Sequence, residues 1–219
     1  MTLEKASRKA VNYALLNFHY AKTVAPRAHD NAYSVFNNQG EWCGVICFGM
    51  GATPQIGSPY GLKQGEAIEL IRVALNGKQE MTSKVVALGL RLLKKHSPLV
   101  KLVVSYADKG QEHKGTIYQA TNWYYVGSSV SSGTEYLING KWRHAKSIKP
   151  HIKKVAKKRR SSGKNKYLFP LDKSLLPLCN KLKKPYPKKA VEVHELNTLH
   201  SSKEAGGANP TQPLKKKPK

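Results

Sequence analysis

Residues 67–104 most constrain the fold, because they predict a strand, a helix and a second strand in succession. Ala67–Leu75 is a mainly apolar run of strand length, although its alanine and leucine content leaves a helix open. An Asn-Gly pair breaks this run. Met81–His96 then has apolar side chains at helical spacing and basic residues in its last turns. Leu102–Val104 is apolar and β-branched, which suits a buried strand. Two strands joined through a helix predict a parallel pair with a right-handed crossover.

The segment before this unit predicts one helix and two antiparallel strands. Apolar side chains recur every three or four residues across residues 4–24, which indicates an amphipathic helix. Asn31–Asn38 and Glu41–Met50 are β-prone runs around an Asn-Asn-Gln-Gly turn. Residues 49–65 are rich in glycine, proline and serine, and form either a loop that approaches the substrate or a mobile connection. The order predicts a mixed α/β fold, with a mainly antiparallel sheet and flanking helices.

The stretch that follows the parallel unit is where we expect an active site. The strand ends at Ser105-Tyr106-Ala107-Asp108, and a polar loop with two glycines comes next. Thr116 is expected to cap a short helix over Ile117–Ala120. Asn122 suits the exit from this helix, and Trp123–Val126 is again β-prone. Polar side chains at a strand end face a crevice, so this stretch predicts a binding site.

The basic charge of the chain lies in its C-terminal part. Residues 1–140 contribute +6 and residues 141–219 contribute +19 to the net charge of +25. We expect a domain at 1–145, a basic nucleic-acid-binding extension at 146–189 and a disordered tail at 190–219. A small hairpin is predicted over Thr134–Trp142, around an Asn-Gly turn. A solubilising segment or a localisation signal would be the alternative for the basic run. The expected phosphate contacts are Lys153, Lys154, Lys157, Lys158, Arg159 and Arg160.

Apolar content and cysteine usage predict an intracellular protein. No stretch approaches the roughly 18 apolar residues of a membrane span, and the N-terminus lacks a signal-peptide core. The three cysteines are an odd number for a disulfide framework. We therefore expect a soluble protein with buried thiols in a reducing compartment.

The order of elements resembles that of the GNAT acetyltransferase superfamily over about residues 1–140. In that superfamily, a helix N-terminus binds the pyrophosphate of acyl-CoA, and two strands splay to admit the pantetheine arm. The resemblance implies that Asn76, Gly77 and Ser83 bind the cofactor, since helix N-termini bind anions. The usual Q/R-x-x-G-x-G/A signature is replaced here by NGKQEMTS. The resemblance also implies that Tyr118 protonates the departing group.

A closer resemblance is to the phage Mom family of DNA adenine modification proteins. Its central motif is similar to SYAD at residues 105–108 and to GTIYQATNW at residues 115–123. Other short motifs similar to that family are the His19-Tyr20 pair, KYLFPLDK at residues 166–173 and PYPK at residues 185–188. The resemblance implies a phage or prophage enzyme in the bacterial host cytoplasm. Its product would be N6-carbamoylmethyladenine in duplex DNA, which protects that DNA from restriction.

These motifs define the candidate site residues. The expected catalytic residues are Tyr118, Asp108, Ser105, Tyr106, His19 and Tyr20. The expected contacts to a flipped adenine are Asn122, Trp123, Tyr124 and Tyr125. An alternative of equal weight is that Trp123 and one of the tyrosines only pack in the core. For Asp108 the alternative role is to form an Asx turn. Candidate ligands for iron or zinc are His19, Tyr20, Asp108 and His113.

Two functions stay open on the sequence. The first is a transferase that modifies adenine N6 in double-stranded DNA. The second is an acyl-CoA-dependent N-acyltransferase that acts on protein or small-molecule amines. A nucleic-acid-binding protein without catalysis would leave the polar strand end at residues 105–108 unexplained. The group donor, the need for a metal, the target sequence and the oligomeric state remain open.

Overall fold

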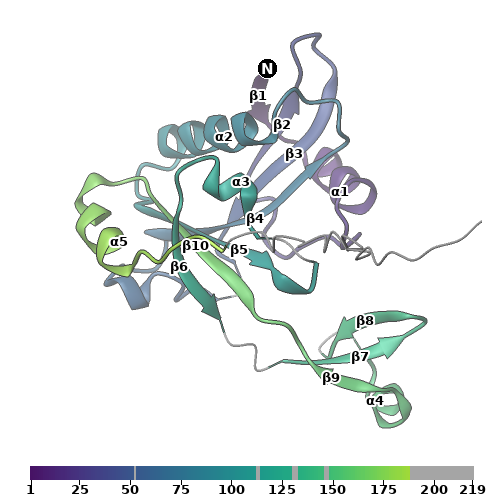
Figure 1. Cartoon of the computed structure of the whole chain (residues 1–219). Coiled ribbons are helices and arrows are strands. Elements are labelled where there is room, and N and C mark those ends of the chain that lie inside the picture. Colours follow the sequence, from purple (N-terminus) through teal and green to yellow (C-terminus); the bar gives the residue numbers. More distant parts are fainter. Residues whose placement is uncertain (52, 112–113, 130–132, 146–147, 188–219) are drawn as a thin grey trace, which may run out of the picture. The chain divides into compact units, whose positions relative to one another are not determined.

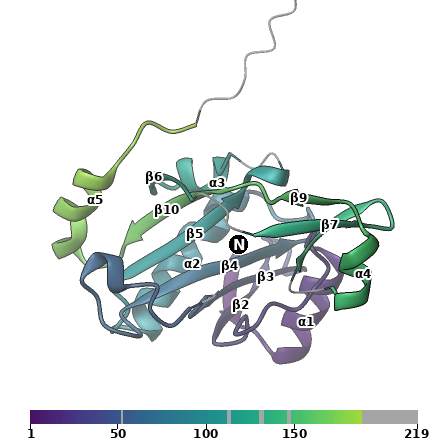
Figure 2. The same ribbon diagram turned by 90° about the horizontal axis from the view of Figure 1, so that it is seen from below.

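The computed structural model describes residues 1–51, 53–111, 114–129, 133–145 and 148–187. Within these residues, seven strands form the central sheet (Figure 1). In sheet order they are β1 (Thr2–Lys5), β2 (Asn31–Phe36), β3 (Trp42–Gly49), β4 (Ala67–Leu75), β5 (Leu102–Asp108), β10 (Lys164–Pro170) and β6 (Tyr124–Ser129). Figure 2 shows β2 to β5 and β10 fanned side by side in this order. Only β4 and β5 pair in parallel, and every other neighbouring pair in this sheet is antiparallel. The expected mixed, mainly antiparallel α/β fold is confirmed.

Helices cover both faces of the central sheet. The helix α2 (Thr82–His96) packs Val85, Val86, Leu90 and Leu93 against Ile46 and Phe48 of β3. The helix α1 (Arg8–Asn17) packs against Val45 and Cys47, the alternate residues of the same strand. Successive strand residues point to opposite faces, so the two helices lie on opposite sides. We call these sides the α2 face and the α1 face. Short helix α3 (Thr116–Gln119) belongs to the α2 face, and α5 (Leu176–Leu182) covers Leu102, Val104 and Leu168 on the α1 face.

The first predicted helix is shorter than the sequence suggested. Residues 2–5 form strand β1, which pairs with β2, and only then does Ser7 cap α1 by accepting a hydrogen bond from Ala10 N at 3.2 Å. The helix ends at Asn17, and Lys22 has a left-handed φ of 46°. The prediction of one helix over residues 4–24 was therefore wrong at both ends, because an edge strand replaces its first residues and a turn replaces its last.

The expected basic extension contributes to two sheets. β7 (Thr134–Ile138), β8 (Lys141–His144) and β9 (Lys158–Arg160) form a small sheet in the order β8-β7-β9, and α4 (Pro150–Val155) connects β8 to β9. Asn139 and Gly140 have φ values of 50° and 72°, so the predicted hairpin and its turn are confirmed. The following strand, β10, joins the central sheet between β5 and β6. The sequence analysis did not predict β10, and the whole of the expected tail at 190–219 lies outside the described residues.

The remaining short elements of the described residues are three single turns of 3-10 helix, at Ser58–Tyr60, Lys109–Gln111 and Lys173–Leu175. All three cysteines are buried and free, and burial raises the pKa of the Cys47 thiol to about 12. No helix in the described part of the chain is both long enough and apolar enough to cross a membrane.

Candidate active site

The candidate site lies where β4 and β5 diverge. The two strands pair only over Ala67–Glu69 and Leu102–Val104. Beyond these residues β4 continues beside β3, whereas β5 continues beside β10 as far as Asp108. The Ser105 hydroxyl bridges the strands where pairing ends, because its Oγ lies 2.9 Å from the Leu70 carbonyl oxygen. The backbone carbonyl beside the divergence is therefore satisfied by a side chain instead of by a ladder hydrogen bond.

Tyr118 meets Ser105 at this point, with 2.8 Å between their hydroxyl oxygens. The Tyr118 ring packs between Trp123 and Tyr167, at centroid distances of 5.1 Å and 4.9 Å. Burial raises the pKa of Tyr118 to about 12, and hydrogen bonding with Ser105 opposes this rise. Tyr118 is thus a neutral phenol at neutral pH, able to donate its proton at the end of a buried polar pair.

The loop before α3 positions Tyr118 differently from the expected Thr116 cap. Gly115 is the N-cap residue and has a left-handed φ of 74°. A Cβ at this position would lie 2.5 Å from ring atoms of Tyr167, so the backbone approaches that ring closely. The Tyr167 hydroxyl donates to the Lys114 carbonyl oxygen at 2.5 Å. Glycine is therefore required both for its backbone conformation and for space.

The strand-end motif divides between the two faces of the sheet. Val103 and Ala107 pack in the same cluster as Tyr118, which places Ser105 on the α2 face. Val104 and Tyr106 pack in the cluster on the α1 face, and Asp108 has the same parity. Ser105 and Tyr118 therefore approach the divergence from one side, and Tyr106 and Asp108 approach it from the other.

Glu69 links the two sides electrostatically. It is the last β4 residue that pairs with β5, and Ile68 and Leu70 on either side of it pack on the α2 face. Its charge raises the pKa of both Tyr118 and Tyr106, in each case as a smaller cause than burial. A carboxylate therefore lies within electrostatic reach of phenols on both faces.

His19 and Tyr20 reach the same region from the chain after α1. Burial raises the pKa of Tyr20, the charge of Asp108 raises it further, and Arg72 opposes both effects. The rings of His19 and Tyr20 lie 4.3 Å apart, and His19 Nδ1 accepts a hydrogen bond from Ala21 N at 3.1 Å. The structure thus brings Tyr20 within electrostatic range of Asp108, although the two are far apart in sequence.

Asp108 makes the local turn that the sequence left open as an alternative. Its Oδ1 accepts from Gly110 N at 2.9 Å and lies 3.5 Å from Ser162 Oγ. The side chains of His19, Tyr20 and Asp108, three of the expected metal ligands, are of the types that bind iron. His113, the fourth candidate, lies outside the described residues. Among the residues that are described, no group of three or more His, Cys, Asp and Glu side chains is placed to hold a metal ion.

Three charged residues of this region were not assigned to the site by the sequence analysis. Glu69 and Arg72 interrupt the apolar run of β4, and this interruption was the available signal. Arg72 Nη1 donates to the Ile71 carbonyl oxygen at 2.8 Å, while its Nε is buried without a hydrogen-bond partner within the described residues. Lys166 pairs with Tyr106 across β10 and β5, and its Nζ lies 4.9 Å from the Tyr60 ring centroid and 5.9 Å from that of Tyr106. Burial lowers the pKa of this lysine.

The aromatic residues expected to contact a base occupy different environments. Trp123 is fully buried and packs against Tyr118 and Phe169, as the packing alternative proposed. Tyr124 belongs to the cluster on the α1 face, whereas the Tyr125 ring lies 5.3 Å from that of Tyr167. Of these aromatic residues, the two tyrosines are partly exposed and are better placed than Trp123 to touch a substrate.

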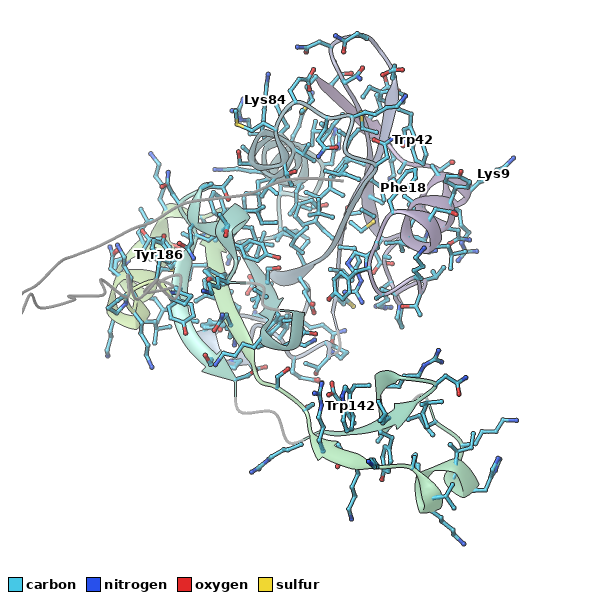
Figure 3. The ribbon with its side chains drawn as sticks, turned by 45° about the vertical axis from the view of Figure 1, so that its right-hand side comes forward. Lys9, Phe18, Trp42, Lys84, Trp142 and Tyr186 are labelled. Carbon is cyan, nitrogen blue, oxygen red and sulfur yellow. The ribbon has the colours of Figure 1, made fainter. Side chains whose placement is uncertain are left out.

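A cavity of about 550 Å³ lies beside α2, the end of α3 and the end of β10. Its lining includes Ser83, Lys84, Arg91, Lys94, Asn122 and Phe169, and Lys84 can be followed in Figure 3. The N-cap residue of α2, Met81, provides no side-chain hydrogen bond, and the first turn contains no acidic residue. Lys84 places a cation in the first turn of this helix, and a cation beside a helix N-terminus suits a phosphate-bearing ligand.

The other expected cofactor residues, Asn76 and Gly77, make local hydrogen bonds. Asn76 Oδ1 accepts from Lys78 N at 3.0 Å, and Gly77 N donates to Gln79 Oε1 at 3.1 Å. Of the three residues implied by the sequence resemblance, the structure places only Ser83 in the cavity lining.

The expected phosphate contacts lie on α4, on β9 and between them. Lys153 and Lys154 belong to α4, and Lys158 to Arg160 form β9. Arg159 Nε donates to Glu135 at 2.9 Å, and its guanidinium lies 4.2 Å from the Trp142 ring centroid. Arg159 is therefore engaged within the small sheet.

The chain is similar in sequence to a curated protein. The chain is 29% identical over 133 residues to the methylcarbamoylase mom of Escherichia phage Mu, a match that covers 58% of this chain and 52% of that protein. The chain thus spans about half the length of this curated relative.

Solved acetyltransferases also align with most of this chain, at low sequence identity. A Bacillus subtilis acetyltransferase in complex with CoA is 10% identical, with a TM-score of 0.47 and coverage of 78% of this chain and 97% of that chain. The spermidine/spermine N-acetyltransferase SpeG from Vibrio cholerae, in complex with manganese ions, is 13% identical, with a TM-score of 0.45 and coverage of 80% and 94%. The model of the Mom protein family matches residues 1–188. The chain therefore belongs to the Mom protein family.

Proposed function

We propose that this protein is a transferase that modifies the N6 amino group of adenine in duplex DNA, giving the N6-carbamoylmethyl derivative. Family membership and the methylcarbamoylase relative support the reaction class. The observation that carries the proposal is the hydroxyl pair of Ser105 and Tyr118 at the divergence of β4 and β5, with Glu69 in electrostatic reach.

The chemistry requires an acid and a base on opposite sides of the reacting carbon. The N6 lone pair forms the new N–C bond while the bond from that carbon to its leaving group breaks. N6 loses one proton to a base, and the leaving group gains one from an acid, so that charge and atoms balance. Adenine N6 is a weak nucleophile because its lone pair is delocalised into the ring. Orientation and proton transfer must therefore supply much of the acceleration.

Tyr118 suits the role of the acid. With a pKa of about 12 the phenol is protonated at neutral pH, and it comes from the α2 face, the side of the phosphate-suited cavity. Once Tyr118 has given up its proton, the Ser105 hydroxyl can donate to the phenolate and stabilise it. The donor would therefore approach from the α2 face, with its leaving group toward Tyr118.

Asp108 and Glu69 are the candidate bases, and they approach from the α1 face. Tyr20 and Tyr106 lie within the fields of these carboxylates, and they can orient an adenine edge by hydrogen bonding or stacking. The target adenine must leave the helix to reach them, since a base inside a duplex is inaccessible to such a site. Tyr124 and Tyr125 are further candidates for contact with the flipped base.

The lining of the cavity beside α2 suits a phosphate-bearing donor, such as a CoA derivative. Ser83 and the backbone N–H groups of the first turn of α2 would hold phosphate, and Lys84, Arg91 and Lys94 would balance its charge. The N6-carbamoylmethyl product requires that the donor carry the leaving group on the methylene carbon of a –CH2–C(O)NH2 group, because attack of N6 on the carbonyl carbon of an acyl-CoA would give an N6-acyl product instead.

A test of the function is to express the chain in bacteria, digest the DNA to nucleosides and search for a new deoxyadenosine by mass spectrometry. We expect an adduct with the mass of N6-carbamoylmethyl-deoxyadenosine, together with plasmid resistance to restriction. Tyr118→Phe serves as the inactive control, and Tyr13→Phe, at an exposed tyrosine of α1, as the active one. Unmodified DNA together with newly acylated protein or polyamine would instead support the acyl-CoA-dependent N-acyltransferase.

A further inference from the structure

The small sheet has two faces of different chemical character. In β7, Tyr136 lies directly opposite Arg143 of β8 and Lys158 of β9, and Thr134 lies opposite Arg160. Directly opposed residues of antiparallel strands point to the same face. One face therefore carries Tyr136, Arg143, Lys158 and Arg160, which we call the basic face.

The opposite face is internally paired. The register puts Glu135, Leu137, Trp142 and Arg159 on it. Arg159 Nε donates to Glu135 at 2.9 Å, and its guanidinium lies 4.2 Å from the Trp142 ring centroid. This one arginine thus connects all three strands of the small sheet through its side chain. The Glu135 carboxylate compensates the charge of Arg159, and the contacts with Glu135 and Trp142 fix the orientation of its guanidinium.

The basic face has unbalanced positive charge. Arg143, Lys158 and Arg160 are all exposed, and Tyr136 between the first two is half-buried. The positions that the register assigns to this face include no acidic residue. Neighbouring strands lie about 4.8 Å apart, and alternate residues of one strand lie about 7 Å apart. The backbone positions of the three cations therefore fall within a patch roughly 10 Å across.

We propose that the basic face binds the phosphate backbone of duplex DNA, while Arg159 and Trp142 hold the small sheet in shape. The inference rests on the proposed function, which makes duplex DNA the partner of this chain. Lysine, arginine and tyrosine side chains are typical phosphate contacts, and they position a protein on DNA without reading its sequence. The proposal adds Arg143 and Tyr136 to the interface and removes Arg159 from the contacts predicted from sequence.

The test compares two triple variants of the full chain that remove equal charge. One replaces Arg143, Lys158 and Arg160 with alanine. The control replaces Lys5, Arg8 and Lys9, which are exposed at the N-terminal end of the chain and of which Lys9 projects from α1 in Figure 3. Binding to a short fluorescein-labelled duplex is followed by fluorescence anisotropy over a range of salt concentrations. The slope of log K against log salt should fall by about 0.9 for each phosphate that the protein no longer neutralises, and so by about 2.7 for the first variant.

A third variant separates the effect of charge from that of folding. Arg143→Lys, Lys158→Arg and Arg160→Lys together keep every charge, and this variant should retain most of the slope. Arg159→Gln keeps an amide donor for Glu135, so the small sheet should keep its shape. The slope should stay within about 0.3 of the wild-type value, because the compensated guanidinium releases no counterion on binding. Equal slopes for the two alanine variants, or a reduced slope in the charge-keeping variant, would overturn the proposal.

Binding to unmodified DNA needs no reaction, so the interface and the enzymatic function can fail separately. If the slope falls as expected while cells contain no modified adenine, the interface stands and the proposed reaction does not. If DNA is modified while the alanine variant keeps its slope, the reaction stands and the interface does not. A fall in affinity confined to single-stranded RNA, measured with a labelled oligonucleotide of the same length, would also overturn the duplex assignment.

Discussion

Ser105 Oγ and the phenolic oxygen of Tyr118 lie 2.8 Å apart, and Ser105 Oγ is also 2.9 Å from the Leu70 carbonyl oxygen. A carbonyl oxygen only accepts, so the arrangement in which Ser105 donates to Leu70 requires Tyr118 to donate to Ser105. The three groups then form one directed chain of hydrogen bonds from α3 to β4. Its first proton is the one that the proposed reaction uses.

Tyr118→Phe should keep the shape of the site and remove this proton. We expect modification of DNA to fall by about 10²–10⁴-fold, the usual contribution of general acid catalysis. The free energy of unfolding should fall by only about 1 kcal/mol, the typical net value of one hydrogen bond. The measurements are the fraction of modified deoxyadenosine by mass spectrometry and urea unfolding. Activity within threefold of the wild-type value would mean that another group supplies the proton.

The raised pKa of Tyr118 predicts a specific loss of stability in alkali. The ordinary value is 10.0 and the folded value is about 12, so between these pH values the native state binds more protons than the unfolded state. Stability contributed by this residue is therefore present below about pH 10 and is lost as the pH rises to about 12. The loss amounts to at most about 2.7 kcal/mol, from about 1.36 kcal/mol per pH unit.

Because other buried tyrosines and cysteines also titrate in this range, the check is a difference between two proteins. Urea unfolding of the wild-type protein and of Tyr118→Phe is compared at increasing pH. The stability advantage of the wild type should shrink over the predicted interval, since phenylalanine has no proton to lose. A constant difference over the whole interval would show that Tyr118 titrates like a tyrosine in water.

Gly115→Ala should displace α3 and with it the Tyr118 phenol. The added Cβ would lie 2.5 Å from the Tyr167 ring, which is fully buried and cannot easily move. Gly140→Ala is a matched control, because Gly140 has a similar φ of 72° but no atom within 4 Å of the added Cβ. We expect Gly115→Ala to cost about 1–3 kcal/mol more than the control, as overpacking does in other cores. Thermal denaturation measures this difference, and equal costs would mean that Tyr167 can shift.

Asp108→Asn should abolish DNA modification while leaving DNA affinity within about twofold, because the expected phosphate contacts lie elsewhere. The amide oxygen of asparagine can still accept the hydrogen bond from Gly110 N, so the local turn should survive. Asp30→Asn, at an ion pair with Arg27 that is 4.0 Å long, provides the surface control. Modified DNA in cells that express Asp108→Asn would shift the role of the base to Glu69, and Glu69→Gln would then be the inactive variant.

Features that depend on local rules could be predicted from the sequence alone. Strand β4 has the predicted bounds of Ala67–Leu75, and α2 begins one residue after the predicted start and ends at the predicted His96. Both hairpins form at their Asn- and Gly-containing turns. Periodicity and turn chemistry act over a few residues, and here tertiary packing agrees with them. The motif that contains Ser105 and Tyr118 was found for the same reason, since it follows a recognisable buried strand.

The position of β10 and the division of the site were decided by tertiary structure. Lys166 pairs with Tyr106, sixty residues earlier in the chain, and no local pattern specifies such a partner. The alternation of β5 places Ser105 and Asp108 on opposite faces, and the short pairing with β4 leaves both on the part of β5 that extends beyond this pairing. The roles of Glu69 and Arg72 also depend on tertiary structure, because these charged residues lie on a strand that is otherwise apolar. Long-range pairing is set by the burial of whole faces and by the satisfaction of backbone hydrogen bonds, which depend on all the strands together.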